Sequence, residues 1–190
     1  MVEQKQIRGA ELRRAVLDAT MRQIETVGID QVRIAEVAAA AGVHETSIYR
    51  RWKTLPRLVA DALVAYSTVE IPIPDTGSVR TDLTRFALAL SRFVGTRLGA
   101  ALVRSAVLQA DDPEVIAARA EYWARRLAVA EQIVRRAKDR GEVTPETDPR
   151  LVVLALGGLI QMYDIQLGCG LSPEDLEKAV NMLVDGISPR

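Results

Sequence analysis

Histidine and cysteine are almost absent from this 190-residue chain, which contains one of each, His44 and Cys169. A histidine-based metal site, a Cys/His nucleophile pair or a Ser-His-Asp triad needs more of these residues, or a plausible pairing of them. No glycine-rich pattern that cradles phosphates is present either. We therefore expect no metal, no cofactor and no ordinary enzyme chemistry, although catalysis by carboxylates alone stays open.

Long apolar runs are also lacking. The longest, from Leu151 to Ile160, is well short of the ~20 residues that cross a bilayer, and it ends at Gln161. The N-terminal residues are charged and contain no apolar core of a secretory signal. A single cysteine forms no internal disulfide, which fits a reducing compartment. The sequence therefore predicts a cytoplasmic protein that does not enter a membrane.

Neither sign of charge predominates, because 25 Lys and Arg balance 25 Asp and Glu. The distribution is uneven, however: residues 1–60 hold ten basic and seven acidic side chains. This modest excess becomes informative only through the positions of the basic residues. Arg50, Arg51 and Lys53 follow closely behind His44, in the stretch GVHETSIYRRWK.

What the sequence does contain is helical periodicity from one end to the other, with no convincing β-strand. Capping residues and glycines separate the periodic segments. The separators are Gly28, Thr54, Asp112, Gly141, Asp148, Gly168 and Ser172. The longest apolar stripe is Ile116, Ala120, Trp123, Leu127, Ala130, Val134 and Ala137.

One segment breaks this periodicity. Residues 71–78, IPIPDTGS, contain two prolines and a glycine, so they are expected to form a linker. The chain is therefore predicted to be all-α, with about nine helices in all. We expect an N-terminal three-helix head at residues 10–70 and a larger C-terminal helical bundle at residues 71–190.

Residues 33–52, RIAEVAAAAGVHETSIYRRW, have the pattern of two short helices joined by a tight turn. Close helices need a small residue at their crossing, and the turn needs one that tolerates positive φ; Ala38 and Gly42 meet these needs. In a DNA-binding helix-turn-helix, the second helix presents short polar side chains to base edges and longer ones to phosphates. The residues predicted to do so here are Glu45, Thr46, Ser47, Tyr49, Arg50 and Lys53.

A solvated helix face is the competing interpretation, because Ala-Gly-Val between helices is common. The context favours the helix-turn-helix, since a capped amphipathic helix precedes it and a new helix follows Trp52 directly. Trp52 itself is expected to pack between helices rather than to stack on DNA. Arg51 is as well explained by a solvated or salt-bridged side chain as by a DNA contact.

The arrangement resembles the TetR (tetracycline-repressor-like) family of bacterial transcriptional regulators. The resemblance covers about residues 10–70 and is specific through a combination of residues. These are Val16, Leu17, Ala19, Gly28, Val37, Ala38, Ala41, Gly42, Val43, Ser47, Ile48, Tyr49, Trp52 and Leu58. It implies a homodimer in which each chain joins a three-helix DNA-binding head to a ligand-sensing helical body.

Three positions depart from the family pattern. Arg33 stands where the family often has a capping Thr; arginine could keep a phosphate contact but cannot accept the capping hydrogen bond. His44 stands at the usual Ser or Thr cap of the recognition helix, and we expect it to cap the helix or contact the backbone, with phosphate binding second. Leu55 replaces a common lysine, whose role would pass to Lys53 or Arg57.

Two further groups of residues are predicted in the body. Aromatic residues are few, yet several lie in the central helices, where they could line an apolar effector pocket or simply form the core. The pocket candidates are Phe86, Leu90, Phe93, Tyr122, Trp123, Arg126, Gln161 and Tyr163. The last two helices have apolar sides suited to pairing with a second copy. The interface candidates are Leu151, Leu154, Gly158, Leu176, Val180, Leu183 and Ile187.

The sequence therefore predicts a homodimeric transcriptional regulator that binds a double-stranded DNA operator. We expect a repressor that a small apolar effector releases. The rival interpretation is a helical-bundle enzyme or a partner-binding scaffold whose first sixty residues only resemble a DNA-binding head. An enzyme would be expected to bury a cluster of ionisable groups.

Overall fold

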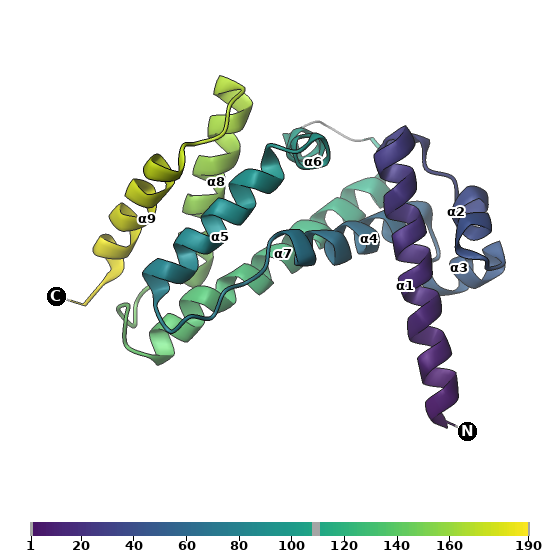
Figure 1. The fold of residues 1–190 in the computed structure, drawn as a ribbon, viewed down its shortest axis with the longest axis horizontal. Helices are drawn as coiled ribbons and strands as arrows, with labels where there is room; N and C mark the ends of the chain where they lie inside the picture. Colours follow the sequence, from purple (N-terminus) through teal and green to yellow (C-terminus); the bar gives the residue numbers. More distant parts are fainter. Residues whose placement is uncertain (1, 108–110, 190) are drawn as a thin grey trace. The chain divides into compact units, whose positions relative to one another are not determined.

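The computed structural model describes the backbone of residues 2–107 and 111–189 and the side chains of residues 9–104 and 111–189 (Figure 1). Within these residues all regular structure is helical, as predicted: nine α-helices and one short 3-10 helix. Their bounds are α1 Val2–Val27, η1 Ile29–Gln31, α2 Ile34–Ala41, α3 Glu45–Trp52, α4 Leu55–Glu70, α5 Val79–Val94, α6 Arg97–Val107, α7 Pro113–Asp139, α8 Pro149–Leu167 and α9 Pro173–Ile187.

The helices form two compact units. Unit 1 contains residues 1–67 and 110–122, and unit 2 contains residues 68–109 and 123–190. Two helices, α4 and α7, contribute residues to both units. In unit 1, α1 packs against η1 and α2, and α2 packs against α3. In unit 2, α5 packs against α6, α8 and α9.

The core of unit 1 follows the apolar stripe of α1. Val16, Leu17 and Ile24 are buried, and the hydroxyl of Thr20 is satisfied by donating to the carbonyl of Val16 at 2.8 Å. Val27 was predicted to lie on the same stripe, but its side chain is 47% exposed because α1 ends there. Gly28 does end the helix, although its ψ of 162° is not that of a left-handed cap.

Several helices begin at the capping residues predicted from the sequence. The carboxylate of Asp148 accepts from the N–H groups of Arg150 and Leu151 at the start of α8. The hydroxyl of Ser172 accepts from the N–H of Asp175 and donates to its carboxylate, which lowers the pKa of Asp175 below its ordinary value. Asp112 accepts from the N–H of Glu114 in the first turn of α7. These caps fix helix starts by purely local hydrogen bonds.

Two predicted features are wrong. The hydroxyl of Thr54, expected to cap α4, is buried without a hydrogen-bond partner. The stripe predicted for α7 is out of register over its first half, where Ile116 and Ala120 are exposed. Ala118 and Tyr122 are buried instead, and so is the charged Arg126. An inward-facing arginine has no counterpart in a stripe defined by apolar residues, which explains the error.

Arg126 is buried because it binds the linker. Its guanidinium donates to the carbonyl of Ile71 at 3.2 Å. Ten residues later on α7, Arg136 donates to the carbonyl of Pro74 at 2.6 Å and pairs with the carboxylate of Asp75 at 3.1 Å. Residues 71–78, which we call the strap, are thus irregular in backbone but fixed by hydrogen bonds, as buried backbone carbonyls require.

The far end of the strap is fixed by Asp82, a fully buried carboxylate on α5. Its Oδ1 atom accepts from both the N–H and the hydroxyl of Thr76, each at 2.8 Å. Its Oδ2 atom lies 3.8 Å from the guanidinium of Arg140. The N–H of Val79 donates to Glu142 at 2.6 Å, so the loop after α7 also holds the start of α5.

One face of α8 is apolar and exposed. Its exposed large side chains include Leu151, Leu154, Met162 and Ile165, whereas Leu156 and Ile160 on the opposite face are buried. By length and composition, α8 is the single unbent helix within the described residues that could cross a membrane, a property that buried core helices share. The shortness of the apolar run in the sequence therefore does not by itself exclude a membrane span. The apolar face needs another explanation.

The apolar side of α9 was predicted to pair with a second copy, but it is largely buried within the single chain. Leu176 and Val180 are buried to 1% and 0% exposure in the single chain, where α9 packs against α5. Their side chains are therefore unavailable to a second copy. Leu183 and Ile187 are half-buried, and the most exposed apolar side chain of the helix is that of Met182. The apolar spacing alone does not show whether this side of α9 packs against a second copy or, as the structure shows, against α5.

A tight corner joins α5 to α6, which bend by 90° relative to each other. The hydroxyl of Thr96 donates to the carbonyl of Phe93 and accepts from the N–H of Gly99. A Cβ atom on Gly99 would lie 1.9 Å from the carbonyl oxygen of Phe93. A Cβ atom on Gly95, in the same corner, would lie at ordinary contact distances of 3.6 Å.

We therefore expect Gly99→Ala to lower the free energy of unfolding by about 1–3 kcal/mol, because backbone atoms must move apart. Urea denaturation followed by circular dichroism measures this change. Gly95→Ala is the matched control and should change the midpoint little. Equal stability of the two variants would contradict the close approach at this corner.

Candidate nucleic-acid interface

The turn between α2 and α3 is built as the helix-turn-helix pattern requires. Gly42 has φ 66° and ψ 34°, the left-handed conformation that glycine adopts without strain. The N–H of Val43 then reaches back to the carbonyl of Ala38 at 3.0 Å and closes the end of α2. Val37 and Ile48, both fully buried, pin the two helices to the core of unit 1.

The buried residues of α3 determine which of its faces meets solvent. Ile48 and Trp52 are four residues apart and point inward. Ser47 is half-buried, and the remaining polar residues predicted to contact DNA are exposed. We define the recognition face as these exposed residues: Glu45, Thr46, Tyr49, Arg50 and Lys53. It carries three groups that can bind phosphate and two that can approach base edges.

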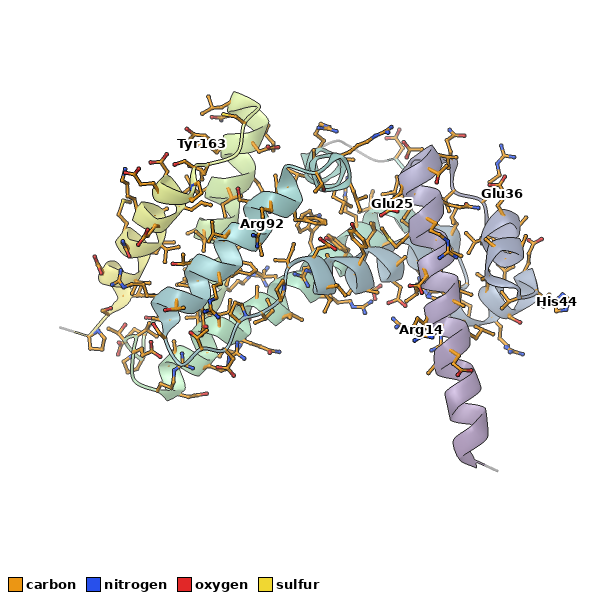
Figure 2. All side chains as sticks on the ribbon, in the orientation of Figure 1. Arg14, Glu25, Glu36, His44, Arg92 and Tyr163 are labelled. Carbon is orange, nitrogen blue, oxygen red and sulfur yellow. The ribbon has the colours of Figure 1, made fainter. Side chains whose placement is uncertain are left out.

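His44 precedes α3 in an extended conformation, and its side chain makes no capping hydrogen bond. The prediction that the imidazole caps the helix is therefore wrong. Only the carbonyl of His44 contributes, accepting from the N–H of Ser47 at 2.9 Å. The exposed ring points away from the α2–α3 pair (Figure 2).

Arg33 also makes no side-chain cap, as its chemistry predicted. Its backbone N–H donates instead to the side-chain oxygen of Gln23 on α1 at 3.2 Å. The amide nitrogen of Gln23 donates to Glu36 on α2, also at 3.2 Å. Gln23 thus ties the start of α2 to α1, a role that nothing in the sequence signalled. The exposed guanidinium of Arg33 makes no hydrogen bond or ion pair with the described residues.

Lys53 ends α3 with φ 68° and ψ −49°. It is the single non-glycine residue within the described part of the chain with a positive φ. Such a conformation is strained for a residue with a Cβ atom and costs on the order of 1–3 kcal/mol. Glycine would adopt this conformation without strain, and Lys53 places an exposed ammonium group at this end of the recognition face.

Trp52 packs inside unit 1, as predicted. Its side chain is 6% exposed, and the guanidinium of Arg51 lies 5.6 Å from the ring centroid, within cation–π range. The indole Nε1–H donates to Oδ2 of Asp61 on α4 at 3.1 Å. The same oxygen accepts from Arg13 on α1 at 2.8 Å. One carboxylate therefore connects α1, α3 and α4.

Asp61 was missed by the sequence analysis. The available signal was an acidic residue in the otherwise apolar run LVADALV, which places one carboxylate among buried neighbours. Its partners are 48 and nine residues away, so only the folded chain identifies them. The carboxylate side chain is 17% exposed.

The residues predicted to line an effector pocket are distributed as follows. Phe86, Leu90 and Phe93 are buried on α5, and Trp123, Gln161 and Tyr163 are half-buried in the same unit. Tyr122 is buried but belongs to unit 1, and Arg126 binds the strap. Cys169 is exposed. Within the described residues, no three His, Cys, Asp or Glu side chains are grouped to hold a metal ion.

Comparison with known families decides the class of protein. Residues 16–59 match the family described as bacterial regulatory proteins, tetR family. Residues 73–183, more than half of the chain, match the tetracyclin repressor-like, C-terminal domain. The chain belongs to the TetR family of transcriptional regulators. It is therefore a helix-turn-helix transcriptional regulator, and the family is one of regulators rather than enzymes.

Individual relatives support this assignment. The HTH-type transcriptional regulator AqdR of Rhodococcus erythropolis is 49% identical over 184 residues, which cover 97% of this chain and 89% of that protein. The TetR family transcription regulator SCO0332 has the same fold, with a TM-score of 0.77 and 28% identity over 94% of this chain and all of that one. The flavonoid-responsive regulator FrrA shares the fold at a TM-score of 0.64 and 20% identity, over 96% and 99% of the two chains.

In this TetR-family chain we expect Asp61→Ala to destabilise unit 1 by about 1–3 kcal/mol, because it leaves the buried indole N–H without its acceptor. Asp61→Asn keeps an oxygen acceptor and should cost less. Intrinsic fluorescence during thermal unfolding, measured in a Trp123→Phe background so that Trp52 alone emits, reports the change. The matched control is Asp18→Ala, which removes an exposed carboxylate from α1. If Asp61→Ala and Asp18→Ala melt alike, Asp61 does not hold the helices together.

Proposed function

We propose that this regulator is a homodimeric, cytoplasmic repressor that binds an operator through unit 1 and is released when a small apolar effector binds in unit 2. The observation that carries the DNA-binding part is the recognition face of α3. Its base-reading residues are exposed, while Ile48 and Trp52 on its other side anchor the helix. Arg33 and His44 flank this face and add phosphate-binding groups. Because these cations are gathered around α3, the proposal is compatible with a net charge of zero for the whole chain.

Two variants of Lys53 separate its electrostatic contribution to DNA affinity from its effect on stability. Lys53→Ala and Lys53→Gly remove the same ammonium group, but only glycine relieves the positive φ. Each variant should flatten the slope of log affinity against log salt by about one unit, because one phosphate contact is lost. Lys53→Gly should be more stable than Lys53→Ala by about 1 kcal/mol.

Fluorescence anisotropy with labelled operator at several salt concentrations gives the slopes, and thermal melts give the stabilities. The control is Arg97→Gln, which removes an exposed cation from α6. An unchanged salt slope in both Lys53 variants would contradict a phosphate contact at Lys53.

The dimer is proposed to form through the exposed face of α8. Leu151, Leu154, Gly158, Met162 and Ile165 recur at steps of three and four, so they lie on one stripe. Gly158 has no atom within 4 Å of where its Cβ would lie, which permits a second helix to approach its backbone closely. Met182, the most exposed apolar side chain of α9, and the half-buried Leu183 are proposed to join this interface. A two-fold pairing of α8 and α9 with their copies makes a four-helix interface.

Leu154→Glu should convert the dimer to a monomer of 20.8 kDa at micromolar concentration, because pairing would bury two unpaired carboxylates. Sedimentation velocity measures the mass. Val69→Glu is the matched control, since Val69 is also an exposed apolar residue but lies on α4. A wild-type monomer, or a Leu154→Glu dimer of unchanged affinity, would refute this interface.

The effector is proposed to bind beside the stripe of α5 that carries Phe86, Leu90 and Phe93, where α5 packs against α8. The side-chain amide of Gln161 lies on the side of α8 that faces Leu90, since a Cβ atom on Gly157 would be 4.0 Å from the amide and 3.8 Å from Leu90. An apolar lining with one orienting amide suits an apolar ligand. Trp123 and Tyr163 are proposed as further members of this site.

A further inference from the structure

A groove of about 380 Å³ lies on a different face of α5 from the proposed effector site. Its lining residues on α5 are spaced i, i+3, i+4 and i+7, so they form one stripe of the helix. Phe86, Leu90 and Phe93 form a separate stripe. The groove is lined by Pro72 and Pro74 of the strap and by Arg85, Leu88, Ala89 and Arg92 of α5.

The groove has an apolar floor with a cation at each end. Leu88 and Ala89 lie between Arg85 and Arg92, whose Cα atoms are separated by about 10 Å along the helix. Both arginines are exposed, and neither has a hydrogen-bond or ion-pair partner among the described residues. Arg92 lies near the C-terminal end of α5 (Figure 2). Long, flexible arginine stems can bring both guanidinium groups over the floor.

The opposite wall of the groove is rigid. Pro72 and Pro74 have no N–H groups and present apolar rings. The strap that carries them is held in place by Arg126, which binds the carbonyl of Ile71, and by Arg136, which binds that of Pro74. A wall that is already ordered loses little conformational entropy when a ligand binds. Arg126 and Arg136 of α7 are engaged by the strap, whereas Arg85 and Arg92 of the groove remain available.

These features select the chemistry of the ligand. A carboxylate matches the planar fork of a guanidinium group and forms charge-assisted hydrogen bonds with it. A bare inorganic anion would leave the proline rings and Leu88 uncovered, and a neutral apolar molecule would leave the guanidinium groups unpaired. We propose that this groove binds a small apolar acid, with its carboxylate on Arg85 and Arg92 and its apolar part between Leu88 and the two prolines.

Isothermal titration calorimetry of the full-length protein with octanoate tests the proposal, in the absence of DNA. Octanoate should bind saturably, and Arg85→Gln and Arg92→Gln should each raise the dissociation constant about tenfold, as loss of one charge-assisted contact requires. Arg97→Gln is the matched control, because it removes an exposed arginine from α6 outside the groove. Octanol, of equal chain length, should bind more weakly and should not distinguish the variants.

Saturable octanoate binding that survives in the Arg85→Gln, Arg92→Gln double variant would overturn the proposal, as would an absence of binding to the wild-type protein. Because no operator is present, either result leaves the DNA-binding proposal untouched. The arginine variants should have the same melting temperature as the wild-type protein, since both side chains are exposed. A lost octanoate signal in a correctly folded variant therefore reports the groove and not the fold.

Discussion

The helix-turn-helix of this regulator depends on one partly buried acceptor. Oδ2 of Asp61 receives hydrogen bonds from Trp52 on α3 and Arg13 on α1, while Asp61 itself belongs to α4. The recognition helix has only eight residues, too few to be stable alone. Its orientation is therefore set by its inner face, where Ile48 packs in the apolar core and Trp52 donates to the carboxylate of Asp61. The outer face stays exposed to solvent and is the surface that we propose to bind DNA.

A second set of hydrogen bonds governs the segment that follows α4 in the chain. The strap has no regular structure, yet α7 fixes its carbonyls at Ile71 and Pro74 and α5 fixes Thr76. The helix that carries Asp61 thus runs directly into a segment held by the body. An effector can change DNA binding only through a difference in its affinity for two states. Because the strap follows α4 directly in the chain, a change in the position of the strap would be transmitted to α4.

The sequence was sufficient wherever structure is set by neighbouring residues. The caps at Asp148 and Ser172, the turn at Gly42 and the burial of Trp52 all follow from local hydrogen bonds or from helical spacing, and the structure confirms them. Prediction failed where distant partners decide. Arg126 looks like a surface residue until the strap accepts its hydrogen bond. Val180 looks like an interface residue until α5 covers it. His44 occupies a capping position without the short hydroxyl that capping favours.

The central claim is that two copies of the recognition face read DNA in a two-fold arrangement. Selection of bound sequences from a random pool of double-stranded DNA tests it most directly. The account predicts enrichment of an inverted repeat whose half-sites are spaced for the major groove on one side of the duplex. It also predicts that Glu45→Ala or Thr46→Ala changes the bases selected within each half-site. Enrichment of a single unrepeated site, or of no sequence at all, would contradict it.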